Sequence, residues 1–182
     1  MAFSEHVPWG LDRDLRPVSE RVAVAFGAIQ SDLLRYLRAI AGDDLAEDVA
    51  SQVWVEVLAG ASGFRGDGAA FRRWVFATAR RRALDEHRRW WRRSVKLYPP
   101  GDRELERAAT DEGAHPERDA ALACIARLPR AQAEIVLLRV LGGFSAEEVA
   151  ELTGRTGGAV RVIQHRALRR LADELRRDPD WL

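Results

Sequence analysis

The chain has little sulfur or imidazole chemistry: its 182 residues include one cysteine, Cys124, and four histidines. A single cysteine excludes an intramolecular disulfide framework and a zinc site built from thiolates. The histidines, at positions 6, 87, 115 and 165, show neither an HxxxH nor an HExxH spacing. We therefore expect no metal site and no cofactor. Cys124 lies on an apolar helix face and is expected in the core rather than as a redox sensor.

Membrane and catalytic signatures are missing as well. No apolar run approaches the roughly 18 residues of a transmembrane helix, and residues 1–10 lack the basic-then-apolar order of a signal peptide. We expect a soluble, cytoplasmic protein with no membrane insertion. No nucleophile, base and orienting group can be assembled, and segment 63–68 lacks the GxGxxG spacing of a phosphate-binding loop. The sequence therefore predicts no catalytic residues.

Charge is distributed unevenly along the chain, although the net charge is only +1. Residues 1–64 carry a net charge of −5, residues 65–98 carry +8, residues 99–120 carry −4 and residues 121–182 carry +2. Basic zones of this kind favour polyanions, most often nucleic acid.

Helical spacing of apolar residues dominates the sequence, and the alternation typical of strands is nearly absent. The pattern predicts helices over residues 18–40, 45–58, 69–93, 117–128, 130–141, 146–152 and 156–177, with a glycine-rich loop at 60–68. Residues 97–116 are acidic, contain prolines and glycines, and are predicted to form a flexible linker. The expected fold is all-α, with two small helical domains at 18–96 and 117–177.

Residues 145–175 show the pattern of a helix-turn-helix. Ser145 and Glu148 form a predicted capping box at the start of its first helix, and Gly154 lies in the turn. The apolar stripe expected on the second helix consists of Val160, Ile163, Ala167, Leu168, Leu171 and Leu175. The opposite face presents arginine and glutamine, which make bidentate contacts to guanine and adenine edges in the major groove. An ordinary helical hairpin with a solvated basic face would give the same pattern, so this alternative stays open.

The predicted helix over residues 69–93 interleaves aromatic side chains with arginines. Arginines hold phosphates and aromatic rings stack on unpaired bases, so the combination favours a DNA strand that is held open. In the alternative interpretation Phe71, Trp74 and Phe76 are core residues and the arginines form a solvated face; the spacing does place Trp74 on the apolar side. Trp90 and Trp91 are adjacent, so they cannot both face one core.

Taken together, the two halves resemble the sigma-70 family of bacterial RNA polymerase initiation factors, in its extracytoplasmic-function (ECF) group. In the first half, LAEDVASQVW (residues 45–54) and FRRWVFATARRRALD (residues 71–85) are similar to the region 2 motifs AEDLVQETF and F..WL..IARN..ID. In the second half, LPRAQAEIVLL (128–138), FSAEEVA (144–150) and GAVRVIQHRAL (158–168) resemble the region 4 motifs LP...R.V..L, LSYEEIA and GTVKSRLHRAR. The resemblance covers about residues 20–95 and 117–177.

The resemblance implies a non-catalytic factor that binds core RNA polymerase and recognises promoter DNA. Region 2 would meet the clamp helices of the largest subunit through Glu47, Asp48 and Gln52, and region 4 would dock on the flap of the second-largest subunit. The helix-turn-helix would read the −35 element as duplex through Arg155, Thr156, Arg161, Gln164, His165 and Arg169. The −10 element would be captured as it opens by Phe64, Arg65, Arg72, Arg73, Arg80, Arg81, Arg88, Trp90 and Trp91. A separate anti-sigma factor is implied as the means of control.

Two other classes of protein account for part of the sequence. A dimeric helix-turn-helix repressor or activator explains residues 145–175 but leaves the tryptophan- and arginine-rich helix unexplained. A helical adaptor protein fits the number of helices but not the placement of the arginines.

Overall fold

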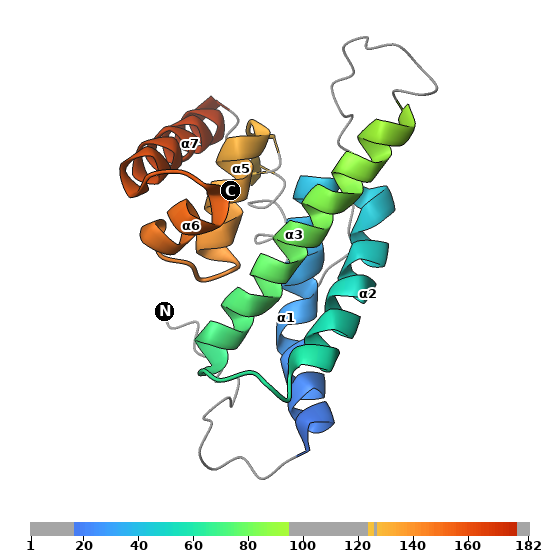
Figure 1. Ribbon diagram of the computed structural model, residues 1–182. Coiled ribbons are helices and arrows are strands. Elements are labelled where there is room, and N and C mark those ends of the chain that lie inside the picture. Colours follow the sequence, from blue (N-terminus) through green and yellow to red (C-terminus); the bar gives the residue numbers. More distant parts are fainter. Residues whose placement is uncertain (1–16, 95–123, 126, 178–182) are drawn as a thin grey trace.

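The computed structural model describes residues 17–94, 124–125 and 127–177, which contain α-helices and no strand (Figure 1). The helices are α1 (Val18–Ala41), α2 (Asp43–Gly60), α3 (Gly68–Ser94), α5 (Arg130–Val140), α6 (Ala146–Thr153) and α7 (Gly157–Arg177). Cys124 and Ile125 are also helical, and both are buried. The described part of the chain confirms the all-α fold class.

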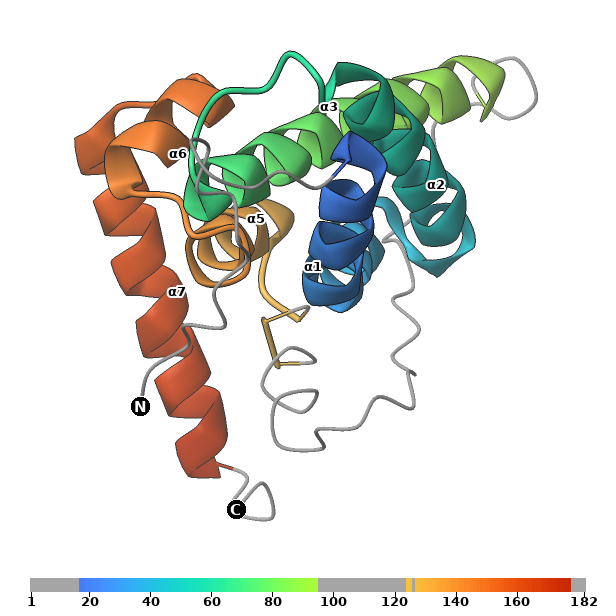
Figure 2. The same cartoon turned by 90° about the horizontal axis from the view of Figure 1, so that it is seen from below.

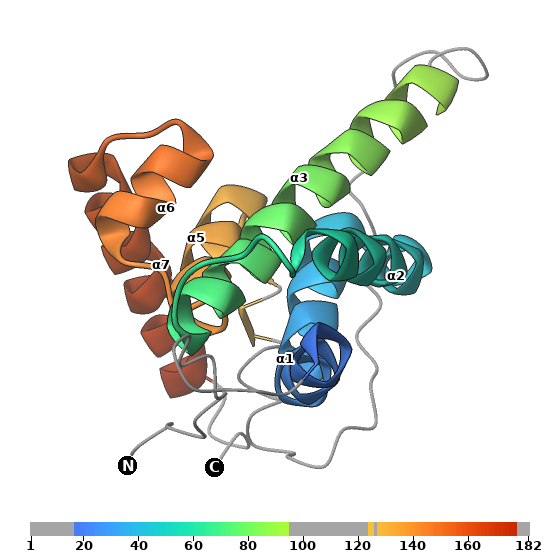
Figure 3. The same ribbon diagram turned by 60° about the horizontal axis from the view of Figure 1, so that its bottom comes forward.

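The first half is a bundle of α1, α2 and α3, which pack on one another along their apolar stripes (Figures 1 and 3). Each helix repeats apolar residues at intervals of three and four, so one face of each can be buried. The centre of this core consists of Ile29, Leu33, Leu37, Val49, Val53, Val57, Phe71, Val75 and Ala79, all fully buried.

A glycine fixes the tight turn between α1 and α2. Gly42 has φ of +90°, a conformation open to glycine at little cost, and its N–H donates to the Arg38 carbonyl at 3.0 Å. Helix α2 then begins at Asp43, two residues before the predicted start. Asp43 and Asp44 in its first turn favour this earlier start because carboxylates stabilise the positive end of the helix dipole.

The second half is built from α5, α6 and α7, and it packs directly against the first half (Figure 2). Helix α5 lies beside α1, and the buried side chains of Leu137 and Leu141 belong to one apolar core that continues through both halves. The sequence predicted two helical units but not this contact between them. Residues 97–116, the predicted linker, lie outside the described residues.

Two apolar residues are exposed although they fit the helical period: Phe26 in the predicted helix over residues 18–40, and Leu168, which was expected in the apolar stripe of the last helix. Phe26 is 44% exposed and lies against the ring of Trp54 at 5.0 Å, and Leu168 is 49% exposed. Asp32 and Tyr36 take interior positions on α1. Burial raises the pKa of the Tyr36 hydroxyl, and the nearby Glu134 carboxylate raises it further.

Candidate nucleic-acid interface

The helix-turn-helix is fixed by local hydrogen bonds at both ends of α6. Glu148 N–H donates to Ser145 Oγ at 3.1 Å, and Ser145 N–H donates to Glu148 Oε2 at 2.7 Å, which confirms the predicted capping box. Gly154 ends the helix in the left-handed conformation, with φ of +67°. Thr156 then caps α7 by accepting from Ala159 N–H at 3.2 Å. The turn therefore sets the angle between α6 and α7.

Helix α7 presents a basic outer face to solvent. Its inner stripe includes the fully buried Val160 and Ala167. Among the predicted −35 contacts, Arg155, Thr156, Arg161, His165 and Arg169 are exposed, whereas Gln164 is half-buried. Arg161 forms an ion pair with Glu147 of α6, and both side chains are about 60% exposed. Such exposed pairs contribute at most about 1 kcal/mol, so DNA could displace Glu147 from Arg161.

A cluster of aromatic rings supports the loop that precedes α3. The Phe64 ring stacks on Trp74 with centroids 5.2 Å apart, and it meets Phe71 edge to face at 5.2 Å. Phe71 is fully buried and Trp74 is half-buried, as the core interpretation of these two residues predicted. Phe64, predicted to contact DNA, is half-buried by the same cluster. These rings hold the loop in one shape.

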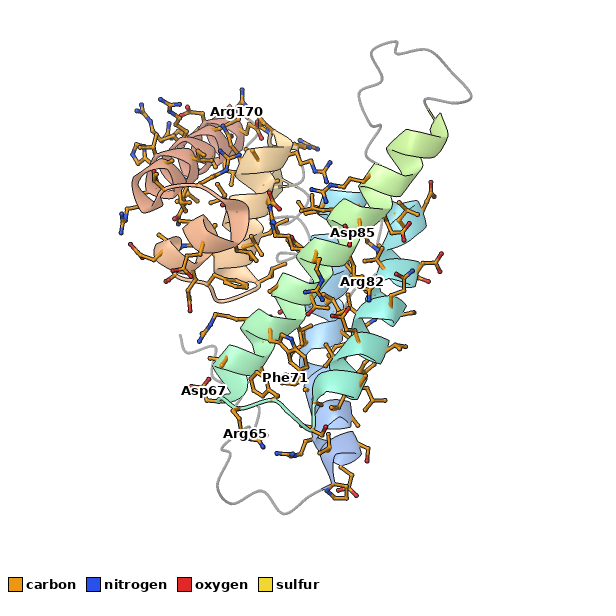
Figure 4. The ribbon with its side chains drawn as sticks, in the orientation of Figure 1. Arg65, Asp67, Phe71, Arg82, Asp85 and Arg170 are labelled. Carbon is orange, nitrogen blue, oxygen red and sulfur yellow. The ribbon has the colours of Figure 1, made fainter. Side chains whose placement is uncertain are left out.

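Arg65 and Asp67 complete the loop (Figure 4). The exposed Arg65 donates from Nη1 to the carbonyls of Ser62 at 3.1 Å and Phe64 at 3.0 Å. Asp67 Oδ1 accepts from Ala70 N–H at 2.7 Å and so caps α3. The loop therefore displays a positive charge beside the start of the arginine-rich helix.

Three of the predicted −10 arginines reach the second half of the chain. Arg72 Nε donates to the Leu141 carbonyl at 2.5 Å, and its Nη2 pairs with the buried Asp32. Arg80 Nε donates to Glu134 Oε1 at 2.9 Å, and Arg73 Nε pairs with Glu148 Oε1 at 3.1 Å. In this arrangement these guanidinium groups hold the two halves together.

Arg81, Arg82 and Arg88 of α3 face α2 or solvent. Arg81 and Arg82 both bind Glu56, and Figure 4 shows Arg82 on the part of α3 that packs on α2. Partial burial acts to raise the pKa of the Glu56 carboxyl, but Arg82 and Arg81 lower it more, so the net shift is downward. Arg88 is largely exposed, 3.7 Å from Asp85. Trp90 and Trp91 lie within α3, but their side chains are outside the described residues.

The face of α2 that points away from the bundle carries the predicted polymerase contacts. Glu47, Asp48 and Gln52 are all exposed, and Glu47 lies 3.8 Å from Arg38. The same helix also exposes Val55 (71%) and Leu58 (51%), which the sequence reading did not single out. Val55 lies four residues and Leu58 seven residues beyond the exposed Ser51, and this spacing was the available signal because such residues share a helix face.

The described residues offer little chemistry of other kinds. No group of three or more histidine, cysteine, aspartate or glutamate side chains there could hold a metal ion. In the same part of the chain, no helix has both the length and the apolar character needed to cross a membrane. Cys124 is buried, as predicted.

Each half of the chain matches a protein family model. Residues 25–93 match the family model for Sigma-70 region 2, and residues 118–171 match the model for Sigma-70, region 4. These spans contain the arginine-rich helix and the helix-turn-helix respectively.

Individual proteins show the same relationship. The chain is 37% identical over 152 residues to the ECF RNA polymerase sigma factor ShbA of Streptomyces griseus, covering 76% of this chain and 78% of the relative. It is 37% identical over 160 residues to the ECF sigma factor SigD of Mycobacterium tuberculosis, covering 81% and 73%. Among solved structures, the sigma factor RpoE in complex with the anti-sigma factor NepR from Bartonella quintana shares the fold, with a TM-score of 0.64, 19% identity and 88% and 97% coverage. CnrH in complex with the cytosolic domain of CnrY has a TM-score of 0.54, 19% identity and 88% and 90% coverage. The chain belongs to the ECF group of the sigma-70 family, the RNA polymerase sigma factors that direct promoter-specific transcription initiation.

Proposed function

We propose that this sigma factor uses three separate surfaces: α7 for the −35 duplex, the 61–67 loop with α3 for the −10 element, and the outer face of α2 for core polymerase. The observation that carries the proposal is the presence, in one chain, of an exposed basic helix-turn-helix and a second arginine-rich helix with an aromatic loop. A simple repressor needs only the first of these. We infer domain bounds of 18–96 and 117–177 for the two functional halves.

At the −35 element, α7 would enter the major groove with its N-terminal turns on the base edges. Arg161 and Gln164 would read bases, because guanidinium and amide groups make paired hydrogen bonds to guanine and adenine. Arg155, Thr156, His165 and Arg169 would add contacts to bases or phosphates. Five arginines and no acidic residue between positions 155 and 172 suit a groove lined with phosphates.

At the −10 element, the proposal requires a strand that has left the duplex. Unstacking or flipping a base costs a few kcal/mol, and stacking on aromatic side chains returns roughly 1–3 kcal/mol per base. Arg65, Arg81 and Arg88 are exposed and would hold the backbone. Arg72, Arg73 and Arg80 contact the second half in this structure, so their use on DNA would require the halves to separate.

Regulation of this chain by a binding protein is consistent with the solved structures that share its fold. RpoE from Bartonella quintana is bound to the anti-sigma factor NepR, and CnrH is bound to the cytosolic domain of CnrY. We propose that an anti-sigma factor likewise binds this chain. We also propose that the protein is non-catalytic and works in the cytoplasm, where its polymerase and DNA partners are found.

Run-off transcription with purified core polymerase tests the function directly. Promoter templates selected by the assembled holoenzyme should give discrete transcripts only when this chain is added. A matched reaction with core polymerase alone supplies the control. Transcripts that start at the same sites without the chain, or an absence of any complex with core polymerase, would contradict the proposal.

A further inference from the structure

The face of α7 opposite its buried stripe exposes an apolar side chain, Val162, among polar and basic neighbours. Val162 is 49% exposed, and its neighbours one turn along the helix are Gly158, His165 and Arg166. The buried stripe of the helix runs through Val160 and Ala167, so Val162 lies on the side away from the core. The sequence reading assigned this residue to neither the core nor the DNA contacts.

The surroundings of Val162 leave its side chain accessible to a partner with a flat or convex surface. Helical side chains tilt toward the N-terminus, so Val162 leans over the turn that contains Gly158. A Cβ placed on Gly158 would have no atom within 4 Å, which means that bare backbone borders the valine on that side. Valine is stiff at χ1 because it is branched at Cβ. The result is a rigid apolar knob near the start of the helix.

Duplex DNA offers one apolar group to such a knob in the major groove. The base edges there are hydrogen-bond donors and acceptors, except for the C5-methyl group of thymine. The flanking Arg161, His165 and Arg166 supply the positive charge that draws this face toward phosphates. We propose that Val162 determines specificity at the −35 element by packing against a thymine methyl group. This inference rests on the proposed reading of the −35 duplex by α7.

The thymine methyl can be deleted without any other change, because deoxyuridine differs from thymidine only at that position. The experiment uses holoenzyme assembled from the full chain and core polymerase, and a −35 duplex selected by that holoenzyme from a randomised pool. Each thymine is replaced in turn by deoxyuridine, and dissociation constants are measured for the wild type and for Val162→Ala. Leu168→Ala is the matched control, because Leu168 is equally exposed at 49% but lies about 9 Å further along the helix.

We expect one deoxyuridine position to weaken wild-type binding about fourfold, the effect of one buried methyl group. Val162→Ala should lose a similar amount on the thymine duplex and nothing further on the deoxyuridine duplex. Leu168→Ala should keep the full deoxyuridine effect. If the losses from Val162→Ala and deoxyuridine multiply at every position, or if no thymine matters, the assignment of Val162 is overturned while −35 reading stands. A pool that yields no preferred sequence overturns both the reading by α7 and the role of Val162.

Discussion

Arg161 and Gln164 occupy different environments, although both were predicted to read bases. Arg161 is exposed and paired with Glu147, whereas Gln164 is half-buried at the edge of the inner stripe of α7. We predict that alanine at either position weakens binding to the preferred −35 duplex by roughly 1–3 kcal/mol and changes the preferred base. Arg170→Ala should weaken all sequences about equally, because phosphates carry no base information. Figure 4 shows Arg170 far along α7 from its start.

Selection of −35 duplexes from a random pool measures this difference. Wild-type holoenzyme and the three variants are compared for consensus and for affinity. The same consensus from Arg161→Ala and Gln164→Ala as from the wild type would contradict base reading by these two residues.

A substitution at Asp48 tests the proposed polymerase-binding surface. The side chain is exposed on α2, and replacing it with arginine removes a negative charge and adds a positive one at the proposed interface. We expect Asp48→Arg to weaken binding to core polymerase by a few kcal/mol, measured by competition with the labelled wild type. Asp173→Arg, the same change at an exposed site on α7, controls for net charge. Equal competition by both variants would remove Asp48 from the interface.

At the scale of single helices, local sequence signals were sufficient to predict most boundaries. Gly42, Gly154 and the Ser145–Glu148 box each act within a few residues, so their effect is visible without tertiary information. The burial of side chains at the edges of the apolar helix stripes was predicted less well. Phe26 and Leu168 fit the helical period but are left partly uncovered by the neighbouring helices, and that depends on packing rather than on periodicity.

The capping box of α6 gives a stability prediction. Hydrogen bonds from the Ser145 backbone and side chain, together with Arg73, lower the pKa of the Glu148 carboxyl, although partial burial opposes them. A lowered folded-state pKa means that the carboxylate stabilises the fold above its unfolded pKa of about 4.3, and that this contribution is lost as the pH falls through the folded value. Ser145→Ala should cost about 1 kcal/mol at pH 7.

Urea denaturation measures both effects. Glu148→Gln should be less stable than the wild type at pH 7. The difference should shrink as the pH falls from about 4 through the lowered folded-state pKa of Glu148, below which both side chains are uncharged. Glu151→Gln, an exposed carboxylate later in α6, is the control. A difference that is constant with pH would mean that the Glu148 charge does not stabilise the cap.

The end of α3 gives a prediction about strand opening. Trp90 and Trp91 lie beyond Ala83, the last fully buried residue of the described part of this helix. We predict that alanine at both positions reduces open-complex formation but leaves binding to the −35 duplex intact. The change removes stacking worth roughly 1–3 kcal/mol per base and no phosphate contact. Permanganate reactivity of unpaired thymines measures opening; normal reactivity with normal core binding would return both residues to a structural role.

At the scale of the whole molecule, the contact between the two halves could not be predicted from the sequence. Arg80 and Glu134 are 54 residues apart, and Arg72 and Leu141 are 69 apart. An arginine suits solvent, phosphate or a carboxylate equally well, so its spacing on α3 could not reveal which partner it meets. The apolar pattern of α5 predicted a buried face but not that its buried residues would join one apolar core with the first half.

The Arg80–Glu134 pair provides a test of this closed arrangement. The two side chains are only 17% and 15% exposed, and removing one partner from such a pair costs roughly 3–5 kcal/mol. Glu134→Arg would set two positive groups against each other, so we expect the halves of the free chain to separate and its radius of gyration in X-ray scattering to rise. The charge swap Arg80→Glu with Glu134→Arg should restore the smaller value. Glu151→Arg, an exposed site on α6, should leave the radius of gyration unchanged.

Separation of the halves also frees Arg72 and Arg73, so the Glu134→Arg variant should bind single-stranded −10 DNA more tightly than the wild type. A radius of gyration that does not respond to Glu134→Arg would mean that this pair does not hold the free chain closed.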